Sequence, residues 1–251
     1  MIFFMPAFLL GTQYASMFWQ QSWYLAAIFL LVLLGLDGYF LVHWKLFRLL
    51  EQEDWSSLQS YTQEKIVHSR IVSAQHINLF LNSCLMLNDL SAIEEAGKKI
   101  QDTSPTTLTK YLAGFGIPVL LRHNGNEIIN FFGSSWEQFK SAKKSIDPWI
   151  GWMYSFGLLL EKQDTKAKEV LLAVLPMVKK SSPLELLTYY LLKNFPDDQV
   201  TRLAENYKQK ITSTYSKDRW AKHMEKSRDS IQVLLLQTII NEATDWLYQE
   251  T

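Results

Sequence analysis

Residues 23–44 read WYLAAIFLLVLLGLDGYFLVHW, an almost uninterrupted apolar stretch. At 1.5 Å per residue, a helix of this length covers about 33 Å, enough for a hydrocarbon core of about 30 Å. Trp23 and Trp44 at the two ends suit the membrane interfaces. The alternatives are a core helix of a soluble protein and a cleaved signal peptide. A core helix rarely carries Trp at both ends, and a signal peptide has a basic start and a shorter apolar run. We therefore predict a transmembrane helix over residues 23–44.

The charged residues are distributed unevenly along the 251-residue chain. No Asp, Glu, Lys or Arg precedes Asp37, whereas residues 45–251 carry all 25 basic residues and 24 of the 25 acidic ones. Lys45 and Arg48 follow the apolar stretch directly, and the positive-inside rule then predicts a body in the cytoplasm, at the inner (plasma) membrane. Residues 1–22 are also apolar. Three alternatives are open for this segment: it lies in the membrane interface, it extends the transmembrane helix, or it makes a first short crossing. Each alternative leaves the body in the cytoplasm.

Asp37 lies within the predicted span, between Gly35 and Gly38. A carboxylate in hydrocarbon costs about 2.5–3.5 kcal/mol on insertion scales. One interpretation is a contact with a polar group on a partner helix, which the two glycines bring close. The other is a tolerated residue near the cytoplasmic side, protonated or hydrated. Gly35, Asp37 and Gly38 are therefore the candidate residues for helix packing in the membrane.

The soluble body shows apolar residues at helical spacing and no convincing period-two alternation, which predicts an all-α fold. Turn signals form two alternating series, near positions 88, 124, 164 and 196 and near 104, 146, 182 and 215. Steps of about 32–42 residues are typical of helical-hairpin repeats. We predict a transmembrane helix followed by an α-solenoid-like stack of hairpins. The expected parts are an apolar segment (1–22), the transmembrane helix (23–44), a juxtamembrane helix (45–70), a helical-repeat domain (71–215) and a C-terminal capping helix (216–251).

Several helix starts can be predicted from capping residues. Ser182-Pro183-Leu184-Glu185 supplies an N-cap hydroxyl, a proline at the first helical position and a glutamate at the third. Asp147-Pro148 has the same features without the glutamate. The pairs Ser91/Glu94 and Ser135/Gln138 have the spacing of further capping boxes.

One window resembles the tetratricopeptide and Sel1-type repeats. Met153, Phe156, Gly157 and Leu160 stand where the tetratricopeptide family has Trp-x2-Leu-Gly-x2-Tyr. The turn that follows, and Pro183 further on, come roughly where the family places them, although the proline is about two residues late. The other repeats lack the glycine. The resemblance implies a degenerate helical-repeat solenoid over about residues 75–215, and an irregular helical bundle is the alternative.

The sequence holds no recognisable catalytic motif. It has neither GxxxxGK[ST] nor GxGxxG nor HExxH, and its five histidines lack the i,i+3 or i,i+4 spacing of helical metal ligands. The single cysteine, Cys84, lies in an apolar run and is expected in the core. Gly114-Phe115-Gly116 predicts a kink or close helix packing. We predict no cofactor, no metal, no catalytic residues and no small-molecule substrate, and a pI near 7.0 argues against nucleic-acid binding.

Two surface features are candidates for partner binding. Residues 200–228 carry a net charge of +5, in which Arg219, Lys222 and Lys226 are the candidate contacts to an acidic partner or to anionic lipid. A solvated helix face is the alternative. The second candidate is an aromatic group with Trp136, Trp149 and Trp152, which would be binding residues if exposed and core residues if buried.

These features together predict a non-enzymatic scaffold or adaptor subunit of a multiprotein membrane assembly, such as a bacterial secretion or conjugation apparatus. Its partners would be other protein subunits and the lipid bilayer. One alternative is a structural membrane subunit that acts mainly through its transmembrane helix. The other is a helical enzyme subunit at the membrane, which would need Asp, Glu and His side chains converging in one pocket.

Overall fold

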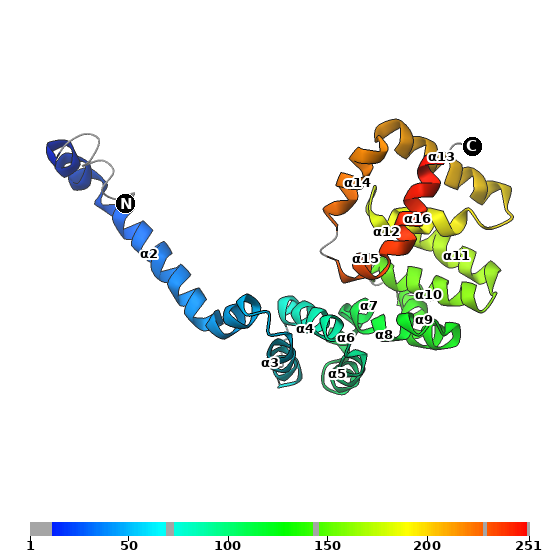
Figure 1. Cartoon of the computed structure of the whole chain (residues 1–251), viewed down its shortest axis with the longest axis horizontal. Helices are drawn as coiled ribbons and strands as arrows, with labels where there is room; N and C mark the ends of the chain where they lie inside the picture. The colour runs from blue at the N-terminus through cyan, green and yellow to red at the C-terminus, as the bar shows by residue number, and fades with distance from the viewer. Residues whose placement is uncertain (1–11, 69–72, 143–145, 228–229, 250–251) are drawn as a thin grey trace. The chain divides into compact units, whose positions relative to one another are not determined.

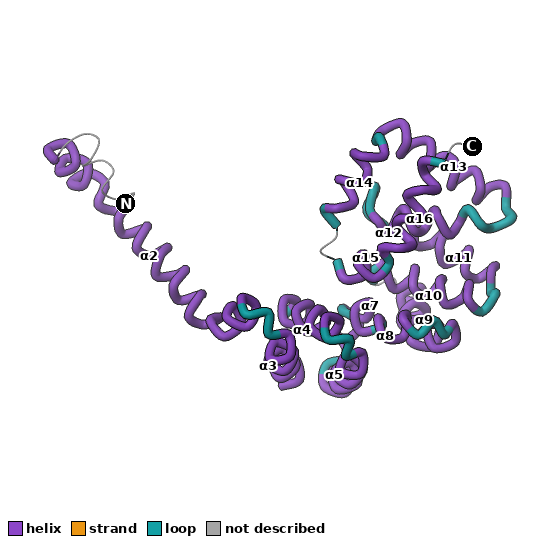
Figure 2. Tube along the Cα trace, in the orientation of Figure 1, coloured by secondary structure: helices purple, strands orange, loops and turns teal. Residues whose placement is uncertain are grey.

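The computed structural model describes residues 12–68, 73–142, 146–227 and 230–249, and all regular structure within these ranges is helical (Figure 2). The predicted all-α class is confirmed. The chain divides into two compact units, Met1–Leu58 and Gln59–Thr251.

The first unit consists mainly of helix α2, Thr12–Glu51, which continues past both ends of the predicted span. Within it, Trp23–Glu51 is long and apolar enough to cross a membrane, and none of its most apolar window is buried. Leu41 and Val42 are 75% and 77% exposed. A core helix of a soluble protein would bury such side chains. The predicted location of residues 1–11 lies outside the described residues, whereas Thr12 onward extends the helix.

The prediction of one juxtamembrane helix over residues 45–70 is wrong. Helix α2 ends at Glu51, and α3 spans Trp55–His68. Glu53 adopts a left-handed conformation (φ 51°), and Asp54 N–H donates to the Leu49 carbonyl at 3.1 Å, which closes the end of α2. The Asp54 carboxylate then accepts from Ser57 N–H at 3.0 Å and starts the new helix.

The second unit contains the remaining helices, which follow one another with short connections (Figure 1). They are α4 (Ala74–Met86), α5 (Leu90–Thr103), α6 (Pro105–Lys110), α7 (Leu112–Phe115), α8 (Ile117–Leu121), α9 (Gly125–Ala142), α10 (Pro148–Leu160), α11 (Asp164–Val174), η2 (Leu175–Met177), α12 (Pro183–Leu192), α13 (Asp198–Thr214), α14 (Lys217–Glu225), α15 (Ile231–Leu235) and α16 (Gln237–Tyr248). Each predicted turn signal falls at a boundary between two of these helices. The prediction of one capping helix over 216–251 is wrong, because the chain there forms three helices.

The same turn geometry recurs at three hairpins. Asn88, His123 and Lys162 have φ values of 53°, 53° and 57° and follow α4, α8 and α10. In the first, Asp89 N–H donates to the Cys84 carbonyl at 2.8 Å, and Gln163 N–H donates equivalently in the last at 2.9 Å. A left-handed residue with this six-to-one hydrogen bond is the Schellman ending of a helix. The turn residues are about 35 and 39 positions apart, within the interval expected from the sequence.

The predicted helix starts are confirmed at two sites and wrong at two others. Ser182 Oγ accepts from Glu185 N–H at 3.2 Å, and Asp147 accepts from Trp149 N–H at 3.0 Å. The cap of α5, however, is Asp89, which accepts from Ala92 N–H, rather than Ser91. Ser135 lies inside α9, because the buried apolar face of that helix continues past it.

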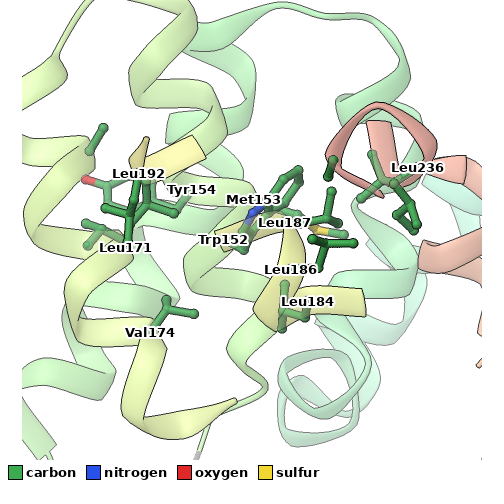
Figure 3. Packing of buried hydrophobic residues seen from close by; sticks show 14 of the residues in the cluster. Trp152, Met153, Tyr154, Leu171, Val174, Leu184, Leu186, Leu187, Leu192 and Leu236 are labelled. Atoms are coloured by element: carbon green, nitrogen blue, oxygen red, sulfur yellow. The ribbon is translucent and has the colours of Figure 1, made fainter. Parts of the chain in front are cut away.

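Two hydrophobic cores support the second unit. The larger, which we call the C-terminal core, extends from α7 to α16 and includes Trp152 and Leu187, which Figure 3 shows packed together with side chains of α11 and with Leu236. The smaller, the N-terminal core, is formed mainly by α4, α5, α7 and α8. Ile231 of α15 belongs to the N-terminal core, whereas Val233 belongs to the C-terminal core. Helix α15 therefore contributes to both cores of the second unit.

Close packing at the two glycines around Phe115 confirms the sequence prediction. A Cβ on Gly114 would lie 2.5 Å from Leu81 Cδ1, and a Cβ on Gly116 would overlap the Phe132 ring. The chain turns at Tyr111 and Gly116, which divides the segment into the short helices α6, α7 and α8.

Candidate binding groove

Two adjoining cavities of about 280 and 270 Å³ lie on the second unit, and Asp147 and Ser230 line both. We call them together the Asp147 groove. The first cavity is lined by Asn78, Leu81, Asn82, Lys110, Tyr111, Ala113, Gly114, Asp147, Ser230, Ile231 and Gln232. The second is lined by Asp147, Pro148, Trp149, Val178, Lys179, Ser182, Pro183, Leu184, Ser227, Ser230 and Val233. Helices distant in sequence form the groove because α15 packs against α7 (Figure 1).

Helix α4 contributes two carboxamides to the first cavity. Asn78 and Asn82 are one helical turn apart, so both lie on the same side of α4. Neither carboxamide makes a hydrogen bond to a described residue. On α15, Ser230 Oγ donates to Gln232 Oε1 at 2.6 Å, which leaves the Gln232 amide group as a donor. The first cavity therefore has an apolar floor that includes Leu81 and several polar groups with free bonding capacity.

Asp147 stands where the two cavities meet. Its backbone lies directly before α10, and Trp149 N–H donates to its carboxylate. Burial raises the pKa of the Asp147 carboxyl above its usual range, more than this single hydrogen bond lowers it. The lysines of the lining, Lys110 and Lys179, are exposed. The groove thus combines one weakly acidic group with two lysine ammonium groups.

The structure separates the three predicted tryptophans. Trp136 and Trp152 are 0% exposed, so the prediction that they bind a partner is wrong, and both are core residues. Their indole N–H groups have no hydrogen-bond partner among the described residues. Trp149 is half-buried and lines the second cavity. The apolar periodicity of α10 does not show which of Trp149 and Trp152 is buried, because both lie on this helix. The packing of α10 against α9 and α11 decides which side chain is covered.

The basic candidates lie on one exposed helix face. Arg219, Lys222 and Lys226 are exposed on α14 and at its end, whereas Trp220 and Met224 face the core. The structure places these three together, as their spacing predicts, and none of them lines the Asp147 groove.

A second group of titratable side chains lies between α12, α13 and α14. Glu185 accepts from Ser181 N–H, and burial raises the pKa of its carboxyl. The Tyr207 hydroxyl is buried with no hydrogen-bond partner in the part of the chain that the structure describes, and burial raises its pKa as well. His223 contacts the Ser181 carbonyl through Nε2 at 2.9 Å. The His223 contact joins α14 to the turn that precedes α12. Within the described residues, no group of three or more His, Cys, Asp or Glu is arranged to hold a metal ion.

The membrane candidates are all exposed on α2. Asp37 is exposed, and a Cβ added to Gly35 or Gly38 would have no atom of the described residues within 4 Å.

Most residues of the groove lie outside the sequence predictions. Trp149 was predicted, but Asn78 and Asn82 were not, although two asparagines four positions apart between apolar residues of one helix are a usable signal. The opposite wall on α15 could not be found, because its position depends on how the chain folds back.

Fold and site together define an all-α protein with an apolar N-terminal helix and a helical body that carries a mixed polar and apolar groove. The chain belongs to the family described as "Uncharacterised Treponema protein", which matches residues 92–249. A protein of Treponema pallidum (strain Nichols), described as "Uncharacterized protein", is 22% identical over 235 residues, which cover 88% of this chain and 74% of the relative. No solved structure matches the chain.

Proposed function

We propose that this protein is a membrane-anchored scaffold subunit of a multiprotein membrane assembly, with its helical body in the cytoplasm. The observation that carries the proposal is that one chain joins an uncovered apolar helix, Trp23–Glu51, to a separately packed helical unit with a groove. Anchoring confines the body to the bilayer and raises its effective concentration near other membrane components. The proposal needs no catalytic group.

Three features of α2 support a membrane span. Its apolar side chains are exposed along the whole stretch that could cross a membrane. Exposed apolar surface of this kind is favourable in lipid and costly in water. Its apolar stretch, residues 23–44, is longer than the apolar region of about 7–15 residues in a signal peptide. Basic residues flank the apolar stretch at its C-terminal end only, where Lys45 and Arg48 follow it. By the positive-inside rule this supports a helical body in the cytoplasm.

The recurring hairpin turns support a repeat architecture of the tetratricopeptide or Sel1 kind. The left-handed residues Asn88, His123 and Lys162 end the first helix of successive hairpins at a nearly constant interval. Gly157, the small residue of the best-matching window, packs its Cα against Ile128 of the preceding hairpin. Stacked hairpins of this kind form extended surfaces that bind protein segments.

Membrane fractionation with a tag fused after Thr251 tests this proposal. We expect the full-length protein to remain in the membrane pellet after carbonate extraction, and the tag to resist protease added to intact cells. Digestion of the tag in intact cells, or recovery of the protein in the high-speed supernatant, would refute it. Crosslinking in native membranes followed by mass spectrometry would then identify the partners.

Asp37 favours a second candidate function, that of a structural membrane subunit. Its carboxylate is exposed on α2 between two glycines that leave room for a closely packed helix. This function predicts that Asp37→Leu disrupts the assembly, whereas substitutions on the cytoplasmic surface do not. Unchanged assembly in this variant would exclude it.

A further inference from the structure

We propose that the Asp147 groove binds an extended, acidic segment of a partner protein and recognises its backbone through Asn78 and Asn82. This inference deepens the proposed scaffold function and depends on it. The observations behind it are the i,i+4 positions of the two asparagines on α4, the residues shared by the two cavities and the charge of their lining.

The carboxamide spacing matches an extended polypeptide. Side chains at positions i and i+4 of a helix are about 6 Å apart. In an extended chain, residues i and i+2 present equivalent peptide groups about 6.5 Å apart. Each carboxamide has donors and an acceptor, as each peptide group does, so Asn78 and Asn82 can bind two successive backbone positions of the same chain face.

The shape of the groove favours a segment over a compact ligand. Asp147 and Ser230 line both cavities, so the two volumes follow one another along the surface. The first cavity is the more polar, whereas Trp149, Pro183 and Val233 give the second an apolar wall. An extended chain that crosses both would place its backbone against α4 and an apolar side chain beside Trp149.

The charge of the lining selects an acidic segment. Lys110 lines the first cavity and Lys179 the second, and neither forms an ion pair among the described residues. Among the described lining residues the one carboxylate is that of Asp147, which is half-buried and accepts a backbone hydrogen bond. A basic segment would find one carboxylate, whereas an acidic segment would find two ammonium groups.

Fluorescence anisotropy with full-length protein in detergent micelles tests the proposal. The probe is a fluorescein-labelled octapeptide of alternating glutamate and valine. Two comparison probes are used. In the first, lysine replaces glutamate, and in the second, alternate backbone amides of the acidic peptide are methylated. We expect saturable binding of the acidic probe and binding weaker by about tenfold or more for each comparison probe. Equal binding of the methylated probe would overturn backbone recognition.

Two variants connect the binding to the groove. The double substitution Asn78→Ala/Asn82→Ala should weaken binding of the acidic probe by about tenfold or more, whereas Asn130→Ala, at an exposed position of α9 outside the groove, should leave it unchanged. Lys110→Glu/Lys179→Glu should reverse the preference between the acidic and the basic probe. Circular dichroism melts show whether each variant is folded. If the double asparagine variant is unfolded, the charge-reversal variant still tests whether the probe binds in the groove.

Absence of saturable binding up to about 1 mM, or unchanged binding in both double variants, would overturn the inference. Membrane fractionation of the same variants separates this result from failure of the scaffold proposal. If the groove inference fails alone, the protein still pellets with membranes and its tag still resists protease.

Discussion

Gly125 and Gly157 mark the place where the backbones of α9 and α10 touch. A Cβ on Gly125 would lie 2.9 Å from the Gly157 carbonyl oxygen, and a Cβ on Gly157 would lie 3.2 Å from the Gly125 carbonyl oxygen. These two helices form the most extensive helix pair of the body. Neither glycine is needed for an unusual φ value, so the requirement is one of space between two helices.

We therefore expect Gly157→Ala to destabilise the body. The new methyl group would lie 2.7 Å from Ile128 Cγ2, and forcing a methyl into a packed core costs about 1–3 kcal/mol. Thermal unfolding of the full chain in detergent, followed by circular dichroism, measures the effect. Gly97→Ala is the matched control, because its Cβ would meet Phe115 at an ordinary 3.5 Å. A Gly157 variant as stable as this control would contradict the close approach.

Trp152→Ala should lower the free energy of unfolding by about 3–5 kcal/mol, the usual cost of removing a large core aromatic. Trp152 is 0% exposed, and its ring stacks on Phe156 at 5.7 Å between centroids. Trp149→Ala should cost less, about 1–2 kcal/mol, since Trp149 is half-buried. Denaturant titration followed by tryptophan fluorescence compares them. Equal losses would show that both side chains are equally buried.

Asp89 should contribute stability that disappears in acid. Hydrogen bonds from Gln59, from Ser91 and from Ala92 N–H lower the pKa of its carboxyl. A lowered pKa in the folded state means that the contribution is present above the unfolded pKa of about 3.9 and is lost as the pH falls through the folded value. We expect Asp89→Asn to be less stable than the parent protein by about 0.5–1 kcal/mol at neutral pH and equally stable in strong acid. Melting temperatures of the variant and the parent protein, measured from neutral pH to strong acid, test this prediction. A stability difference between the two that does not change with pH would exclude this mechanism.

Asp147 should show the opposite sign. Burial raises the pKa of its carboxyl in the folded protein, so the folded state binds the proton more tightly than the unfolded state does. Stability is therefore lost as the pH rises from about 3.9 through the folded value. Asp147→Asn retains an N-cap acceptor and removes the ionisation, so its stability relative to the parent should increase over that interval. A relative stability that decreases instead would show that the folded protein lowers the pKa of this carboxyl.

Cys84 should be unreactive in the folded protein. Its side chain is 0% exposed, and burial raises the pKa of the thiol to about 12. Because the thiolate is the reacting species, we expect a thiol reagent to modify Cys84 only after denaturation. Absorbance after addition of a chromogenic disulfide, with and without denaturant, measures this. Rapid modification of the folded protein would contradict the burial.

The sequence by itself determined where the apolar N-terminal helix and the predicted turns of the body lie. The apolar run from Trp23 to Trp44 marks a helix whose exposed side chains the structure confirms, since length and composition are local properties. The turn signals and the caps at Asp147 and Ser182 were also correct, because a cap depends on a hydrogen bond to a backbone only two or three residues away.

Only the tertiary structure decided which faces are covered and which residues meet. Trp149 and Trp152 are indistinguishable by sequence, and their burial differs because one of them faces the neighbouring helices. The groove brings Asn78 of α4 beside Gln232 of α15, more than half the chain away. No local pattern encodes that contact, because it arises when Ile231 buries its side chain in the core formed by the first helices of the body.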